Sequence, residues 1–592
     1  MKQIPTVRDG PAVLKTVFHS MVELLRARAA EQPDARAYVF LSDRGDEQAS
    51  LTFSELERRA SALAAQLLRR GQRGERALLM FPPGLDFIVA FFGCLIAGMI
   101  AVPMMPPRRF GARDSSASIV ADCTPRFALT SPALLAARSG LAERLKEATL
   151  DFICVDATKD AEAPARSIFP EPGPQDLAFL QYTSGSTSDP KGVMVSHGNL
   201  LANSEMIRLV YGNTRATTYV SWVPLYHDMG LILNVLQTLY VGSLCLLMAP
   251  VSFMQRPLTW LRAISDYRAE FATAPNFAFD LCVDRFRPDQ MAEIDLSGWK
   301  IALNGAEPVR AETMEHFIAT FAPYGFDPKA CSPAFGLAEA TLLASGGGRG
   351  RGLVTRRVSR KALQRCRAAV PSSEEDAQRL AGCGKTLVGE RLMIVDPETH
   401  LRLGTGDVGE IWISGPNVAQ GYWKNAKATT ATFWARIEGK VEERWLRTGD
   451  LGFLDDTGEL YVTGRIKDVI IIRGINHYPQ DLEDTVQASH PALRRHGGAA
   501  FSILGERGEE RLVVVQEVER TQMRRLSIDE IEGAIREAVA SEHEVVVQEI
   551  VLIRPGSLPK TTSGKIQRSL ACRLFLDRRL AELEPALPDA PA

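Results

Sequence analysis

The first four hundred residues alternate helix-period segments with short apolar runs, and this alternation restricts the fold more than any other feature. Residues 53–68 place apolar side chains three and four positions apart, as the buried face of a helix requires. Short runs typical of buried strands occur at 76–80, 152–155, 177–182, 242–247 and 300–303. Helices that alternate with strands favour layers built around largely parallel sheets. The sequence therefore predicts an α/β fold.

The character of the chain changes near residue 391. Short β runs at 391–395, 409–414 and 459–463 are separated by Gly, Asp and Pro, which predicts a small β-rich subdomain. A chain of 592 residues also exceeds the size of a single hydrophobic core. We therefore expect an N-terminal domain at 1–464, with two α/β subdomains and a β-rich subdomain at about 385–464. A hinge at 465–468 and a mobile α+β C-terminal domain at 469–592 follow.

The balance of charges argues against nucleic acid as a partner. Lys and Arg number 69 against 71 Asp and Glu, a formal net charge of -2, so no overall field attracts polyanions. One biased segment, residues 346–357, is rich in Gly and Arg. We interpret it as a mobile surface loop, with nucleic-acid binding as the disfavoured alternative. Any phosphate binding must then be local.

The sequence favours a cytoplasmic protein without a membrane span. Residues 87–104 are as apolar as a span, but Gly93 and Gly98 interrupt them, so we expect a buried helix followed by a buried strand. Residues 1–10 carry charges with no apolar stretch behind them, unlike a secretory signal. The nine cysteines are scattered without a C-x-x-C pair, as expected for free thiols in a reducing cytosol.

The segment most specific for chemistry follows the predicted strand at 177–182. It reads Thr183-Ser184-Gly185-Ser186-Thr187-Ser188-Asp189-Pro190-Lys191-Gly192. Small hydroxyl residues and Gly let backbone N–H groups face an anion, and Lys191 adds a compact cation. The spacing differs from the Walker A pattern. We predict a phosphate-binding loop, and the alternative is a plain Ser/Gly-rich surface turn.

This loop resembles the phosphate loop of the adenylate-forming superfamily, which comprises acyl-CoA synthetases, luciferases and peptide-synthetase adenylation domains. Further motifs match in the family's order across nearly the whole chain. They are Pro224-Leu225-Tyr226-His227-Asp228-Met229-Gly230, Asn304-Gly305-Ala306-Glu307-Pro308, Phe335-Gly336-Leu337-Ala338-Glu339, Arg447-Thr448-Gly449-Asp450, Gly464-Arg465-Ile466-Lys467-Asp468 and Lys560-Thr561-Thr562-Ser563-Gly564-Lys565. The resemblance implies an enzyme that uses ATP and Mg²⁺ to form an acyl-adenylate.

The resemblance also assigns nucleotide contacts. Asp450 would accept from both ribose hydroxyls with Arg465 as a second partner, although the two could form an ordinary surface ion pair. Glu339 would hold Mg²⁺, whose preference for oxygen ligands suits one carboxylate plus ATP phosphates; a solvated helix glutamate is the alternative. Residues implied to border the adenine or the nucleotide are Asn304, Gly305, Ala306, Glu307, Phe335 and Gly336.

Two residues are implied to act at the reacting centre. Lys565 would stabilise the negative charge that gathers on the α-phosphate during carboxylate attack. His227 would stand at the entrance for the carboxylate or acyl group, unless it is a satisfied core histidine. Lys565 lies in the C-terminal domain, so rotation about Lys467 and Asp468 would withdraw it after adenylation and admit the thiol.

Several details resemble the fatty acyl-AMP ligases more than the acyl-CoA synthetases. Ser188 stands where many relatives carry Gly, and residues 473–483 read R-G-I-N-H-Y-P-Q-D-L-E. An extended segment at about 345–382 matches the place of an insertion thought to restrain the C-terminal domain and disfavour CoA transfer. Phe335 departs from the family's usual Tyr, which removes a hydroxyl and puts a hydrogen bond in doubt.

The resemblance implies a fatty-acid substrate and a separate acyl carrier protein, bearing phosphopantetheine, as acceptor. A long- or medium-chain acyl-CoA synthetase that uses free CoA is the nearest alternative, followed by an amino-acid adenylating enzyme and a non-catalytic nucleotide-binding protein. The expected acyl pocket is apolar and comprises Trp222, Met229, Gly230, Ala274, Asn276 and Phe277. The pattern alone sets neither its depth nor the chain length.

Overall fold

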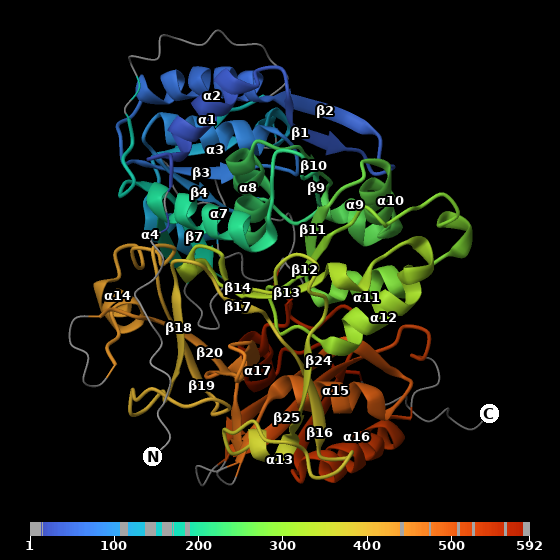
Figure 1. Ribbon diagram of the computed structural model, residues 1–592. Helices are drawn as coiled ribbons and strands as arrows, with labels where there is room; N and C mark the ends of the chain where they lie inside the picture. Colours follow the sequence, from blue (N-terminus) through green and yellow to red (C-terminus); the bar gives the residue numbers. More distant parts are fainter. Residues whose placement is uncertain are drawn as a thin grey trace.

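The computed structural model describes residues 14, 16–106, 116–136, 150–156, 169, 171–183, 190–437, 443–472, 475–505, 510–523, 527–561 and 565–583. The chain runs from two α/β layers at one end of the molecule to a smaller α+β region at the other, as Figure 1 shows. The predicted α/β fold is confirmed.

A six-stranded sheet forms the first layer, in the order β6-β5-β3-β4-β7-β8. Its strands are β3 (Arg76–Met80), β4 (Ile100–Pro103), β5 (Phe127–Thr130), β6 (Asp151–Cys154), β7 (Leu177–Thr183) and β8 (Lys191–Ser196). All neighbours are parallel except β7 and β8, which form an antiparallel hairpin. The predicted buried helix is α3 (Asp86–Ile96), which connects β3 to β4. Among the described residues, we find no helix with the length and apolar character to span a membrane.

A nine-stranded sheet forms the second layer, in the order β17-β14-β13-β12-β11-β9-β10-β1-β2. Its strands are β1 (Arg36–Leu41), β2 (Glu47–Thr52), β9 (Tyr219–Ser221), β10 (Cys245–Leu247), β11 (Phe271–Ala274), β12 (Ile301–Asn304), β13 (Cys331–Gly336), β14 (Leu343–Gly346) and β17 (Lys385–Thr386). The strands from β1 to β13 in this order are parallel, so their carboxyl ends share one edge. Ligands of such sheets bind at this edge. The motifs at 224–230, 304–308 and 336–339 follow β9, β12 and β13, so the fold gathers them there.

Helices cover both sheets. They are α1 (Met21–Glu31), α2 (Phe53–Leu68), α4 (Ser116–Cys123), α5 (Pro132–Ala136), α7 (His197–Tyr211), α8 (Gln237–Val241), α9 (Pro250–Gln255), α10 (Leu258–Asp266), α11 (Asn276–Asp284) and α12 (Ala311–Phe321). Helix α2 begins with a capping box, in which Thr52 and Glu55 satisfy each other's backbone N–H groups. The larger core joins the two sheets through apolar residues such as Phe91, Phe179 and Leu231. This shared core makes the two layers one rigid base for the site.

An antiparallel sheet of β18 (Arg391–Val395), β19 (Gly409–Ser414), β20 (Leu446–Leu454) and β21 (Leu460–Arg465) follows, with α14 (Ala426–Phe433) beside it. Strand β21 ends at Arg465, where the predicted hinge begins. The C-terminal region contains a sheet of β24 (Leu493–Leu504), β25 (Glu510–Val518) and β26 (Val547–Ile553) and a pair, β22 (Ile470–Ile472) and β23 (Ile475–His477). Its helices are α15 (Pro479–Ser489), α16 (Ile528–His543) and α17 (Arg568–Leu576).

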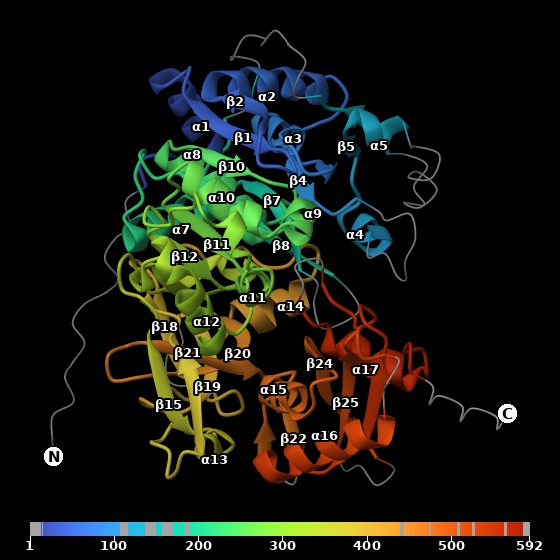
Figure 2. The same cartoon turned by 90° about the vertical axis from the view of Figure 1, so that its right-hand side faces the viewer.

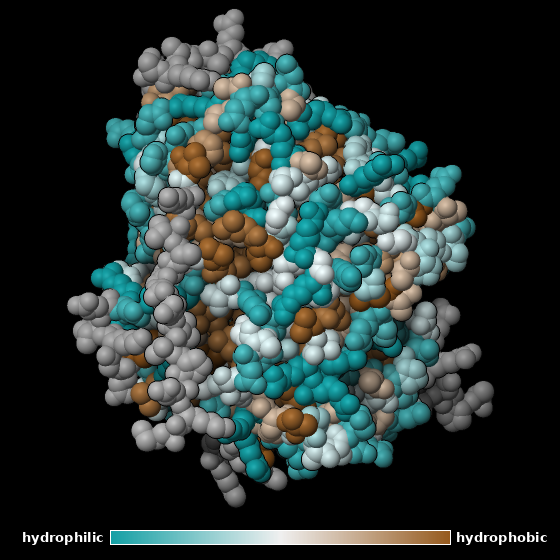
Figure 3. Space-filling model, in the orientation of Figure 1, coloured by the Kyte–Doolittle hydropathy of each residue, from teal (hydrophilic) through white to brown (hydrophobic). Residues whose placement is uncertain are grey.

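The predicted surface loop at 346–357 needs a correction. Strand β14 ends at Gly346, and β15 (Thr355–Ser359) pairs with β16 (Ala377–Ala381), with α13 (Arg360–Leu363) between them. The Gly-Arg stretch is therefore a short connection between two strands. Residues 347–354 form the connecting loop, and the last three residues of the predicted segment, 355–357, belong to β15. Figure 2 shows this hairpin beside the C-terminal region, and the face in Figure 3 is mostly hydrophilic with scattered apolar patches.

Candidate active site

The predicted phosphate loop connects β7 to β8. Thr183 and Lys191 pair directly across this hairpin, so they flank the loop on either side. Ser184, Gly185, Ser186 and Thr187 lie outside the described residues, and their phosphate contacts stay a prediction. Strand β8 also bonds to the segment before α14, since the Met194 and Trp423 amides donate to the carbonyls of Gly421 and Gly192 at 2.9 and 2.8 Å. This contact joins the first sheet to the β-rich region.

Tyr422 connects the predicted phosphate and metal residues. The Lys191 ammonium lies 4.8 Å from the centre of the Tyr422 ring, within the range of a cation–π contact. The Tyr422 hydroxyl donates to Glu339 Oε1 at 2.8 Å. Burial raises the pKa of the Glu339 carboxyl above its ordinary value, and the Tyr422 hydrogen bond opposes that shift. Tyr422 was missed by the sequence analysis, because its role depends on pairing with Val193 across the two regions.

The backbone after Glu339 is strained. Thr341 has φ 67° and ψ -59°, and the Leu342 amide donates to the Ala340 carbonyl at 2.8 Å, which together define a γ-turn with a left-handed centre. A β-branched residue rarely adopts positive φ. The Thr341 hydroxyl donates to the Asn417 carbonyl at 2.6 Å and offsets part of the cost. Gly336 is also required here, because a Cβ would lie 1.9 Å from the Leu342 carbonyl oxygen.

Asp450 and Arg465 form a cross-strand ion pair between β20 and β21. Arg465 Nε donates to Asp450 Oδ1 at 2.9 Å, and the Asp450 side chain is 8 % exposed against 57 % for Arg465. Burial raises the pKa of the Asp450 carboxyl, and Arg465 opposes that shift. Both residues also act on the pKa of the Glu339 carboxyl, with Arg465 lowering it and Asp450 raising it, so the pair lies near Glu339.

Glu410 on β19 holds the Arg447-Thr448-Gly449-Asp450 motif in place. Its carboxylate accepts from Arg447 Nε at 2.8 Å, from the Trp412 indole at 2.9 Å and from the Gly449 amide at 3.0 Å. The residue is 2 % exposed. A buried carboxylate with three donors is costly to disturb. The sequence analysis did not identify Glu410.

The turn after β12 is organised by Asn276 of α11. Asn276 Oδ1 accepts from Asn304 Nδ2 at 2.9 Å and from the Arg310 backbone amide at 3.1 Å. The backbone N–H of Asn276 donates to Glu307 Oε1 at 3.0 Å. Asn276, predicted for the acyl pocket, thus has its side chain bonded to the predicted adenine turn. The left-handed residue of this turn is Ala306, with φ 74°, and not Gly305.

His227 lies just before a π-helix, η2 (Met229–Leu236), an uncommon element that is found at functional sites. Gly230 is needed at its start, because a Cβ would lie 2.0 Å from the Pro224 carbonyl oxygen. Burial lowers the pKa of His227 to about 4, with Asp228 opposing and Lys565 reinforcing the shift. The imidazole is therefore neutral at pH 7, which suits a positioning contact better than a charge partner.

Lys565 reaches this cleft from the C-terminal region. Its amide donates to Thr561 Oγ1 at 3.0 Å, and its carbonyl accepts from the Thr561 amide at 2.7 Å. Burial and Arg465 lower the pKa of the Lys565 ammonium, whereas nearby carboxylates oppose the shift. These carboxylates are Asp228, Glu307 and Asp450. The structure therefore brings Lys565 together with the predicted ribose, adenine and acyl-entrance residues.

Arg568 anchors the start of α17, three residues after Lys565. Its guanidinium bonds both Glu483 oxygens at 2.7 Å and approaches Asp468 at 3.5 Å. Asp468 belongs to the predicted hinge, in which Lys467 is exposed. The hinge and the Lys565 segment are thus joined through one side chain.

The predicted acyl-pocket residues are mostly packed. Trp222 stacks on Phe253 with ring centres 4.0 Å apart and meets Phe277 edge-on, and Ala274 is fully buried. Met229 accepts from Thr273 through its sulfur. A separate apolar cavity of about 280 Å³ lies at the carboxyl ends of strands from both sheets. Segments 81–84, 104–106 and 223–226 line it, next to His227.

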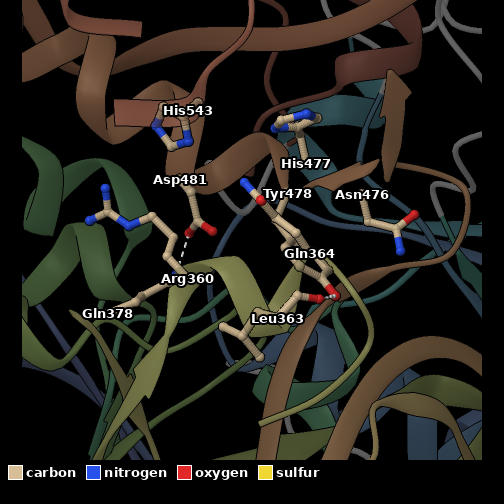
Figure 4. A pocket seen from close by; sticks show the side chains of 9 residues that line it. All are labelled: Arg360, Leu363, Gln364, Gln378, Asn476, His477, Tyr478, Asp481 and His543. Carbon is tan, nitrogen blue, oxygen red and sulfur yellow. Dashed lines mark hydrogen bonds between the residues drawn. The ribbon is translucent and has the colours of Figure 1, made fainter. Parts of the chain in front are cut away.

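The hairpin of β15 and β16 contacts the C-terminal region beside Asp481, as Figure 4 shows. Gln378 Nε2 donates to Asp481 Oδ1 at 2.7 Å, and Arg360 pairs with Glu542 at 3.0 Å. Burial raises the pKa of Asp481 to about 7. Burial also lowers the pKa of His543, which lines the same small pocket, to about 4.

Comparison with known proteins identifies the family. The AMP-binding enzyme family matches residues 25–423, and the Disco-interacting protein 2-like AMP domain matches residues 467–584. Medium-chain-fatty-acid–[acyl-carrier-protein] ligase JamA of Moorena producens (strain JHB) is 44% identical, over 96% of this chain and 97% of JamA. The ligase TtuA of Teredinibacter turnerae has the same descriptive name. It is 34% identical over 95% of this chain and 93% of TtuA.

A solved structure agrees with these sequence matches. The fatty acyl-adenylate ligase from L. pneumophila, in complex with acyl adenylate and pyrophosphate, has a TM-score of 0.73 and 39% identity, and the match covers 95% of this chain and 97% of that chain. The chain belongs to the AMP-binding enzyme family and, within it, to the fatty acyl-AMP ligases.

Proposed function

We propose that this enzyme activates a fatty acid with ATP and then transfers the acyl group to the phosphopantetheine thiol of a separate acyl carrier protein. The observation that carries the proposal is the position of Lys565 among Asp228, Glu307 and Asp450. The names of JamA and TtuA, which are similar along nearly their whole length, support the acyl carrier protein as acceptor.

In the first step, a carboxylate oxygen of the fatty acid attacks the α-phosphorus. The bond to the bridging oxygen of the β-phosphate breaks, and pyrophosphate leaves. Lys565 stabilises the charge that develops on the α-phosphate oxygens. Asp450 accepts hydrogen bonds from the ribose hydroxyls of ATP. The Asn304–Glu307 turn borders the adenine. In the second step, the thiol sulfur attacks the acyl carbonyl and AMP leaves.

Mg²⁺ fits this donor set. It prefers oxygen ligands and is commonly held by one or two carboxylates plus phosphates. Glu339 offers a carboxylate within the site, and no cluster of three or more metal-ligating side chains occurs in the described part of the chain. Bound there, the ion would neutralise phosphate charge. The nine free thiols support work in a reducing cytoplasm.

One experiment separates the acceptors. The enzyme is incubated with ATP, Mg²⁺ and fatty acids of graded length, and then offered free CoA or a phosphopantetheinylated carrier protein. Mass spectrometry identifies the acylated product. We expect acyl-carrier and little acyl-CoA. Efficient acyl-CoA release would instead favour an acyl-CoA synthetase, and failure to form acyl-AMP would refute both.

A further inference from the structure

A cluster of charged side chains crosses between the N-terminal and C-terminal regions away from the reacting centre. Arg310 precedes α12, and Asp280 lies on α11, so both belong to the second sheet layer. His496 and Asp484 come from β24 and α15 of the C-terminal region. Arg310 contacts His496 Nδ1 and lies 3.4 Å from Asp484, and His496 Nε2 lies 3.0 Å from Asp280 Oδ2.

The chemistry of the contact fixes the role of each nitrogen. A guanidinium only donates hydrogen bonds, so Nδ1 of His496 accepts from Arg310. Nε2 of the same ring is then the donor to Asp280. Asp280 is held in turn by the Thr313 hydroxyl at 3.1 Å. His496 therefore bridges a cation and an anion of the other region with a single ring.

The residues of this bridge lie next to the segment that carries Lys565. The backbone carbonyl of His496 accepts from Lys560 Nζ at 2.7 Å. Lys560 pairs with Ile566 as an isolated bridge, which places it at the base of the segment that carries Lys565. On the other side, the Arg310 amide donates to Asn276, which organises the turn with Glu307.

We propose that Arg310 and His496 are positioning residues for the first half-reaction. They hold the C-terminal region in the placement that keeps Lys565 near Asp228, Glu307 and Asp450. The inference rests on the proposed function. In the proposed mechanism, neither Arg310 nor His496 contacts the reacting atoms. Loss of either side chain should slow acyl-AMP formation, which needs Lys565 in place, and spare thiol transfer, which needs it withdrawn.

The test compares Arg310→Ala and His496→Ala with Arg379→Ala. Arg379 also pairs with α12, through Glu312 and Glu315, and makes no ion pair with the described residues of the C-terminal region, so it is a matched control. Fatty-acid-dependent ATP–pyrophosphate exchange should fall at least tenfold in the first two variants and stay within twofold in the control. Transfer from preformed acyl-AMP to a carrier protein should stay within twofold in all three. The double variant should be no slower than the worse single one, since the two residues act as a unit.

A second measurement does not depend on activity. Hydrogen exchange at the amides of Thr561 and Lys565 should be faster in Arg310→Ala and His496→Ala than in the wild type or Arg379→Ala, with equal melting temperatures. Equal exchange by these amides in all variants would overturn the proposal, as would equal losses in both half-reactions. A wild type without fatty-acid-dependent activity would refute the proposed function, and amide exchange alone would then decide the positioning role.

Discussion

The two halves of the active site are built differently. The half from the N-terminal and β-rich regions is fixed by buried hydrogen bonds, with Glu410 under Asp450 and Asn276 under the Asn304–Glu307 turn. The other half is Lys565, which is held by a local turn, in a region that the Arg310, His496, Asp280 and Asp484 contacts join to the N-terminal region. Buried networks are costly to break, whereas partly exposed ion pairs form and separate easily. The fixed half therefore suits nucleotide binding, and the other half suits the proposed entry and withdrawal of Lys565.

The largest effect is expected from the half that contains Lys565. Lys565→Ala should reduce fatty-acid-dependent ATP–pyrophosphate exchange by about 100- to 1,000-fold, because the ammonium stabilises charge that develops only in the transition state. Transfer from preformed acyl-AMP should change little. Lys565→Arg serves as the control that retains the charge. Undiminished exchange in Lys565→Ala would contradict the assignment.

Glu410→Gln tests the fixed half. One amide nitrogen would replace an oxygen that accepts from Arg447, Trp412 or Gly449, so the variant should lose about 2–3 kcal/mol of stability. The KM for ATP should rise about tenfold, because Asp450 loses its support. Thermal melting and initial rates measure the two effects.

The control for Glu410 is Glu443→Gln in the same region. Glu443 pairs with Arg391 at 2.9 Å but is 33 % exposed. Partly exposed pairs of this kind contribute about 0–1 kcal/mol, so this variant should melt closer to the wild type than Glu410→Gln. If both variants behaved alike, Glu410 would be an ordinary ion-pair residue.

The sequence predicted the regular elements better than the residues that position the motif residues, such as Glu410, Arg310 and His496. Helix α2 and strands β3, β18 and β19 have the predicted bounds, because strong periodicity or flanking Gly marks them locally. The motif residues Asp450, Arg465, Glu339 and Lys565 also meet as the resemblance implied.

The residues that position the motif residues have no recognisable local sequence pattern. Glu410 has the appearance of an exposed strand residue until β19 pairs with β20. Arg310 and His496 are 186 positions apart in the sequence, and only the docking of the C-terminal region brings them together. The side chain of Asn276, predicted for the acyl pocket, bonds Asn304 and the Arg310 amide, a contact that a residue number does not reveal. Long-range pairing decides these roles, and no spacing rule encodes it.

A substitution of Asp481 tests the contact between the C-terminal region and the β15–β16 hairpin. Its pKa is raised by burial to about 7, above the value of about 3.9 in an unfolded chain. Between these values the folded protein retains a proton that the unfolded chain releases, so the group's contribution to stability falls as pH rises from about 4 to 7. Asp481→Asn removes this titration. The variant should gain about 1–2 kcal/mol over the wild type at pH 8 and nothing at pH 4.

Melting temperatures of both proteins from pH 4 to 8 measure this difference. Asp529→Asn is the control, since Asp529 lies in the exposed first turn of α16 and is expected to give parallel curves. A constant difference between Asp481→Asn and the wild type across the range would show that Asp481 ionises normally in the folded protein.

The smallest effect concerns the strained turn beside Glu339 in the fixed half. Thr341→Ala keeps the left-handed strain and loses the hydroxyl bond to the Asn417 carbonyl, at a cost of about 1 kcal/mol. Thr341→Gly loses the same bond but relieves the strain, which is worth about 1 kcal/mol at such a position. The glycine variant should therefore melt above the alanine variant despite its greater unfolded-state entropy. An alanine variant at least as stable as the glycine variant would show that the turn relaxes once the hydroxyl is gone, and that the hydrogen bond, not the packing around Glu339, imposes the γ-turn.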